Sequence, residues 1–114
     1  MDIDVRTQDG VKIIKLRGKL SIGPSLDRTN ETIKDLLNAG ESRLLLDLAE
    51  VPMIDSSGIG ILVKAMASAK QRGGGVKLLS PSKFVVQTLK LIGVLNLFEI
   101  FQDENVAVQS FASH

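Results

Sequence analysis

Apolar and polar residues alternate in two segments near the start of the chain, residues 2–8 and 11–18. Alternation with a period of two is typical of strands that bury one face, and Asp9-Gly10 between the segments is typical of a tight hairpin turn. Two later segments, 43–48 and 76–80, are rich in consecutive apolar residues, which indicates strands buried on both faces.

Helical periodicity fills the segments between the predicted strands. Apolar residues recur at the i, i+3, i+4, i+7 spacing of one helix face from Ile59 to Met66. In a later helix, Ser80 is the expected cap and Pro81 the first-turn residue. The four expected helices span about 24–39, 57–72, 81–91 and a short segment after the capping residue Asp103.

A final strand within 97–101 completes the order strand, strand, helix, strand, helix, strand, helix, strand, helix. Strands that alternate with helices need crossover connections and therefore pair in parallel, whereas the N-terminal hairpin is antiparallel. The sequence thus predicts an α/β fold with a central, mostly parallel β-sheet and about four α-helices. The length of 114 residues favours one domain over residues 1–114.

The composition argues against several classes of function. The apolar fraction of 44% and the net charge of +1 are those of an ordinary globular protein, without the basic patch that nucleic acids require. The chain has no cysteine, and its single histidine is the last residue, His114, so we expect neither a metal site nor histidine-based catalysis. No apolar run is long enough to span a membrane, and the first ten residues are unlike a signal peptide. We therefore expect a cytoplasmic protein without a cofactor.

The segment from Asp55 to Gly60, Asp-Ser-Ser-Gly-Ile-Gly, joins a predicted buried strand to a predicted helix. Ligands and partners tend to bind at this edge of parallel sheets. Ser56 or Ser57 can cap the helix. Capping needs neither Gly58 nor Gly60, and glycine inside a helix costs about 0.5–1 kcal/mol relative to alanine. Two interpretations of the glycines remain open: close packing of the helix against the sheet, and close approach of a partner.

This segment supports neither nucleotide binding nor hydrolysis. The phosphate-loop pattern is absent, and Val63 stands where the third glycine of a dinucleotide-binding pattern belongs. A serine nucleophile needs an adjacent base, and no histidine is available to Ser56 or Ser57. We therefore expect a protein that is not an enzyme and has no catalytic residues.

Nearly the whole chain, about residues 3–111, resembles a STAS domain of the anti-sigma-factor antagonist family. The resemblance rests on Gly18 and Leu20 after the second strand and on three longer segments, LLLDLAEVPMIDSSGIGILV, KQRGGGVKLLSPS and LKLIGVLNLFEI. It implies a binding module that takes part in phosphorylation-gated partner switching. Ser56, the first serine after the aspartate, is the implied phosphate acceptor.

The resemblance also implies the partners. An anti-sigma factor with serine kinase activity binds the unphosphorylated protein and thereby releases a sigma factor. Phosphorylation dissociates this complex, and a separate serine phosphatase resets it. The residues expected to bind the partner are Asp55, Ser57, Gly58, Ile59, Gly60 and Ser21.

One motif departs from the family pattern. Members of the family often have Gly-Glu-Leu-Asp after the second strand, whereas this chain has Gly18-Lys19-Leu20-Ser21. The loss of two acidic residues bears on the identity of the partner and on the phosphorylation of Ser56. The alternative is a non-enzymatic STAS subunit of a larger assembly, such as a lipid transporter or a stress-signalling scaffold, in which Ser56 only caps its helix.

Overall fold

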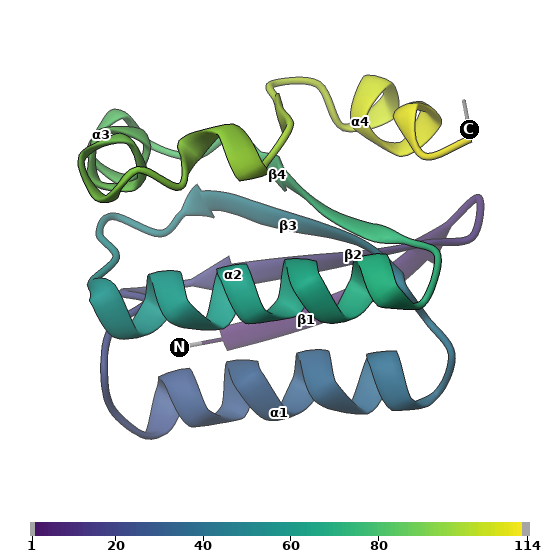
Figure 1. Ribbon diagram of the computed structural model, residues 1–114, viewed down its shortest axis with the longest axis horizontal. Coiled ribbons are helices and arrows are strands. Elements are labelled where there is room, and N and C mark those ends of the chain that lie inside the picture. Colours follow the sequence, from purple (N-terminus) through teal and green to yellow (C-terminus); the bar gives the residue numbers. More distant parts are fainter. Residues whose placement is uncertain (1, 113–114) are drawn as a thin grey trace.

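Five strands form one mixed sheet in the computed structural model, which describes residues 2–112 (Figure 1). The strands follow one another across the sheet in chain order: β1 (Asp2–Gln8), β2 (Val11–Arg17), β3 (Arg43–Glu50), β4 (Gly75–Leu79) and β5 (Ile100–Phe101). β1 and β2 are antiparallel, and the three other neighbouring pairs are parallel, as predicted. His114 lies outside the described residues.

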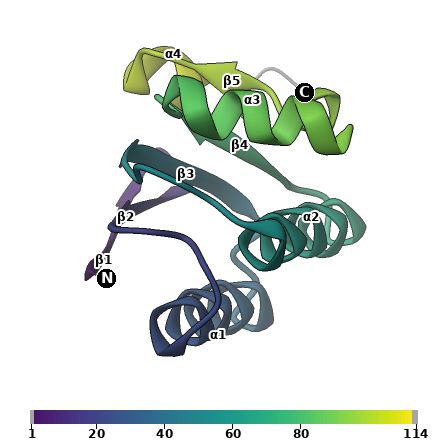
Figure 2. The same ribbon diagram turned by 90° about the vertical axis from the view of Figure 1, so that its left-hand side faces the viewer.

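Helices connect the parallel strands and cover both faces of the sheet. They are α1 (Pro24–Asn38), α2 (Ser56–Gln71), α3 (Lys83–Ile92), the 3-10 helix η1 (Leu95–Leu97) and α4 (Glu104–Ser110). α1 and α2 lie side by side, and α4 lies on the other side of the sheet (Figures 1 and 2). Across residues 2–112, no helix has the length and apolar character needed to cross a membrane.

Alternation along the strands builds two apolar layers. In β2, Ile14 and Leu16 belong to the larger core, which also contains apolar side chains of α1 and α2. Val11 and Ile13 alternate with them and pack with α4 in a smaller core. The strands between the helix layers are therefore apolar on both faces, which explains the nearly continuous apolar run in β3.

The start of α3 differs from the prediction. The cap is Ser82, whose hydroxyl accepts a hydrogen bond from the Val85 N–H at 3.2 Å, and the prediction of Ser80 as cap was wrong. The Ser80 N–H donates to Phe101 O at 2.8 Å, so Ser80, directly after β4, is still hydrogen-bonded to β5. Its φ of 52° then turns the chain, and the helix begins only at Lys83.

The last strand is shorter than predicted. Only Ile100 and Phe101 pair with β4, whereas Leu97, the first residue of the predicted strand, is the last residue of η1. The reason is local hydrogen bonding, because the Phe98 N–H donates to Leu95 O in a turn and is not available to a neighbouring strand. The predicted cap Asp103 is confirmed, since its carboxylate accepts the Val106 N–H at 3.1 Å.

Removing an apolar side chain from the larger core should destabilise the fold. We expect Leu62→Ala, at a position in α2 with no exposed surface, to lower the free energy of unfolding by roughly 2–5 kcal/mol. The control is Leu91→Ala on α3, where the side chain is 88% exposed and the expected change is within about 0.5 kcal/mol. Urea unfolding followed by circular dichroism measures both, and equal effects would contradict this description of the core.

Candidate functional site

The Asp55 carboxylate joins the start of α2 to the loop that follows β2. Asp55 is the N-cap of α2, and its Oδ1 accepts a hydrogen bond from the Gly58 N–H at 2.9 Å. Its Oδ2 accepts a second hydrogen bond, from the Ile22 N–H at 3.0 Å. Asp55 therefore takes the capping role that was considered for Ser56 or Ser57, and both serines lie inside the first turn of the helix.

Backbone hydrogen bonds hold the same two segments together. The Leu20 N–H donates to Met53 O at 3.0 Å, and the Asp55 N–H donates to Leu20 O at 3.3 Å. These bonds form an isolated parallel bridge between Leu20 and Ile54 beyond the ends of β2 and β3. The bridge brings Ser21, which follows Leu20, to the end of the sheet where α2 begins.

The two glycines of α2 have different surroundings. Gly58 is buried, and a Cβ atom there would lie 2.2 Å from Leu20 O and 2.8 Å from Ile54 Cγ1. Close packing within the chain therefore explains Gly58. Gly60 is exposed, and a Cβ atom there would meet nothing within 4 Å. No contact inside the described protein requires glycine at position 60.

The predicted site residues divide into a surface group and a supporting group. Ser56 and Gly60 are exposed, and Ser57 is half-buried. Gly58 and Ile59 are buried, so they support the surface from below and do not present side chains on it. Asp55 is half-buried, and both of its carboxylate oxygens are already engaged in hydrogen bonds.

The surroundings of Ser56 combine a free hydroxyl with a helix N-terminus. Ser56 is the first residue of α2, which has 16 residues and no acidic residue in its first turn. Within residues 2–112 its hydroxyl makes no hydrogen bond to another protein group. The positive end of the helix dipole favours negative charge at this position.

The hydrogen bonds also change the acidity of Asp55. The N–H groups of Gly58 and then Ile22 stabilise the ionised form, so the pKa of the Asp55 carboxyl lies below its ordinary value. Among the described residues, no group of three histidine, cysteine, aspartate or glutamate side chains could hold a metal ion. The chemistry of this end of the sheet is thus that of a hydroxyl, a carboxylate and a helix dipole.

Comparison with known families identifies the architecture. Residues 2–107 match the family model for the STAS domain. The chain belongs to the STAS domain family. The resemblance to a STAS domain over about residues 3–111 is therefore confirmed.

Individual relatives of this STAS domain cover most of its length. A protein of Thermotoga maritima named as an anti-sigma factor antagonist is 29% identical over 75 residues, 66% of each chain. The crystal structure of an antagonist so named from the same organism has a TM-score of 0.89 at 25% identity, over 96% of this chain and 94% of that one. The unphosphorylated form of the anti-sigma factor antagonist SpoIIAA has a TM-score of 0.84 at 18% identity, over 99% and 98%. At that identity the likeness to SpoIIAA concerns the fold.

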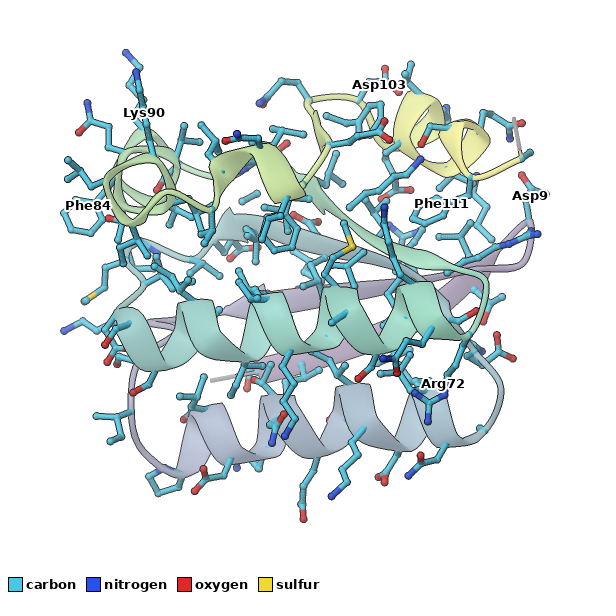
Figure 3. The ribbon with its side chains drawn as sticks, in the orientation of Figure 1. Asp9, Arg72, Phe84, Lys90, Asp103 and Phe111 are labelled. Carbon is cyan, nitrogen blue, oxygen red and sulfur yellow. The ribbon has the colours of Figure 1, made fainter. Side chains whose placement is uncertain are left out.

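Two exposed apolar residues were not predicted as part of this end of the STAS domain. Ile22, whose N–H binds Asp55, has an 80% exposed side chain. Phe84, in the first turn of α3, is 55% exposed and lies at the end of the molecule where α2 begins (Figure 3). Periodicity along the chain cannot separate an exposed apolar residue from a buried one in a short loop or a first helical turn, because both look equally apolar.

Substituting the two glycines should have opposite effects. Gly58→Ala should destabilise the STAS domain by roughly 1–3 kcal/mol, because the added methyl group meets the backbone carbonyl of Leu20. Gly60→Ala should instead stabilise it by about 0.5–1 kcal/mol, because open space surrounds the site and alanine favours the helix. Equilibrium unfolding in urea compares the pair, and a stabilising Gly58→Ala would contradict the packing described here.

The Asp55 hydrogen bonds should make a pH-dependent contribution to stability. Because the folded-state pKa lies below the unfolded value of about 3.9, the contribution is present above that value and is lost as the pH falls through the lower folded pKa. Asp55→Ala should cost about 1 kcal/mol or more at pH 7. The difference from the parent protein should shrink below about pH 4. Urea unfolding of both proteins from pH 7 to pH 2.5 tests this, and a difference independent of pH would refute it.

Proposed function

We propose that this STAS domain is an anti-sigma factor antagonist, and that phosphorylation of Ser56 controls its binding to an anti-sigma factor. The observation that carries the proposal is the division of roles between Asp55 and Ser56. Asp55 caps α2 and fastens the neighbouring loop, which leaves the exposed Ser56 hydroxyl without a structural role. The hydroxyl can therefore be modified while the helix start keeps its cap.

The names of the relatives support the class of partner. Relatives from Thermotoga carry the name anti-sigma factor antagonist, and SpoIIAA is an anti-sigma factor antagonist of the same fold. An antagonist of this kind acts by binding, without catalysing a reaction itself. The proposed partners are an anti-sigma factor with serine kinase activity, which phosphorylates Ser56, and a serine phosphatase, which removes the phosphate.

The proposed binding surface consists of the exposed groups around the start of α2. Ser56 and Gly60 provide a surface with small side chains, which allows a partner backbone to approach closely. Ser57 and Ser21 contribute polar atoms at its border, while the exposed side chains of Ile22 and Phe84 add apolar area. Aromatic and aliphatic side chains of this kind often anchor protein interfaces.

Phosphorylation would change this surface more than the fold. A phosphoserine carries about −1.5 to −2 charges at pH 7. At the first residue of α2 the helix dipole stabilises this charge, so the helix remains formed. The Asp55 carboxylate lies next in the chain and stays ionised at neutral pH. The surface then becomes strongly acidic, and repulsion from an acidic partner surface favours dissociation.

A charge-mimicking substitution tests the proposal. Ser56→Glu should weaken binding to anti-sigma factors encoded in the same genome by about tenfold or more. Its melting temperature should stay within about 4 °C of the parent. Ser68→Glu is the matched control, since it adds the same charge to α2 twelve residues away from Ser56, outside the proposed binding surface, and should leave binding unchanged. Isothermal titration calorimetry measures both affinities.

Two results would contradict this mechanism. Equal affinity of Ser56→Glu and the parent would show that charge at Ser56 does not control the complex. A large loss of helical signal in Ser56→Glu would show that the helix start does not tolerate negative charge.

A phosphorylation assay tests the acceptor itself. With the anti-sigma factor kinase and ATP, Ser56→Ala should take up no phosphate, while Ser57→Ala should still be phosphorylated.

A further inference from the structure

A concave site lies at the opposite end of the sheet from Ser56. Its cavity volume is about 470 Å³, within the range of about 300–1,000 Å³ typical of small-molecule sites. The cavity lies where β3 and β4 begin and where α2 ends, and Phe111, just after α4, forms part of its wall. The 16 residues of α2 place its two ends about 24 Å apart, so this site is separate from the proposed binding surface.

The cavity carries an excess of positive charge. Arg43, Lys70 and Lys77 line it, and Glu99 is the one acidic residue among its lining residues. Arg43 and Lys70 are exposed, and neither forms an ion pair with any residue in the part of the chain that the structure describes. Two cations at the rim are therefore available to an anionic ligand.

Lys77 is a buried cation held in place by its neighbours. Its side chain is 8% exposed, and its Nζ donates to Ser110 Oγ at 2.7 Å. The same Nζ lies 4.5 Å from the centre of the Phe111 ring. The carboxylate of Glu99 is 3.8 Å away and belongs to a 65% exposed side chain, so it neutralises the ammonium weakly. A buried ammonium of this kind gains from an additional anionic partner.

The short β5 leaves a backbone donor at the cavity wall. Leu78 donates its N–H to Glu99 O at 3.0 Å, but Val76, two residues earlier on the same edge of β4, has no strand beside it. The Val76 N–H donates to Met66 Sδ at 3.3 Å, and a thioether sulfur is a weak acceptor. An oxygen of an anionic ligand would be a stronger acceptor at this position.

The remaining walls are apolar. Met66, Leu97 and Phe98 line the cavity, and Leu97 keeps about half of its side chain exposed. Figure 3 shows Phe111 on the inner side of α4, toward the sheet. A ligand that fits this cavity therefore combines an apolar body with an acidic group.

We propose that this cavity binds a small organic anion, a carboxylate or a phosphate monoester with an apolar body. The acidic group lies among Lys77, Arg43 and the Val76 N–H, and the apolar body packs against Leu97 and Phe98. The proposal concerns a different site from Ser56 and is independent of the proposed partner switching.

The test uses phenylacetate and phenyl phosphate as probes, added to the ¹⁵N-labelled protein and followed by NMR. We expect saturable shifts of the amide signals of 73–76 and 96–99 with at least one probe, and the preferred probe shows whether the acid is a carboxylate or a phosphate. Lys77→Met should weaken binding about tenfold or more. Lys90→Met is the control, because Lys90 is exposed, points outward from α3 (Figure 3) and does not line the cavity.

A second variant keeps the proposal testable if Lys77→Met does not fold. Arg43→Gln changes an exposed side chain at the rim and should also weaken binding, by about threefold or more. The absence of saturable shifts with both probes would overturn the proposal. It would also be overturned if inorganic phosphate bound as tightly as the organic probes, or if Lys90→Met weakened binding as much as the cavity variants.

Discussion

The paired hydrogen bonds of the Asp55 carboxylate organise the end of this STAS domain where α2 begins. One oxygen caps α2, and the other holds the N–H of Ile22 in the loop after β2. Both bonds are to backbone donors, so they define the path of two chain segments and not merely the position of a side chain. Gly58 depends on the same arrangement, because the Leu20 carbonyl occupies the space that a side chain at position 58 would need.

This arrangement gives two adjacent residues different surroundings. Asp55 satisfies the helix N-terminus, and Ser56 is left exposed on a helix that already favours negative charge. A phosphate added at Ser56 would thus leave the cap of α2 in place, and its charge would change the binding of a partner and not the fold. The basic cavity at the other end of the sheet uses different elements, since it is built where the strands begin and α2 ends.

Much of this structure could be predicted from the sequence because periodicity and turn chemistry agree along most of the chain. The hairpin at Asp9-Gly10, the parallel strands and the helix pattern from Ile59 to Met66 all match the structure. Predictions failed where two neighbouring residues could each take the same structural role. Ser80 and Ser82 both precede a helix, and only the pairing of Ser80 with the short β5 decides between them.

For the site, too, the sequence predicted the segment but not the contacts that form only on folding. The Asp-Ser-Ser segment could be located, but the helix begins at Ser56, so Asp55 is its cap, and the second oxygen of this carboxylate accepts the N–H of the distant Ile22. Likewise, the reason for Gly58 lies in Leu20, which is far away in the sequence and near only after folding. The positively charged cavity could not be foreseen, because its lysines and arginine come from separate elements.

The proposed role of the exposed Ser56 hydroxyl is that of a regulatory phosphate acceptor. The most direct measurement is intact mass and peptide mapping of the protein recovered from its own cells, with and without stress. We expect phosphate on Ser56, with an occupancy that changes between the two conditions. Persistent absence of phosphate, together with a complex that stays intact in both conditions, would contradict it and favour a constitutive subunit of a larger assembly.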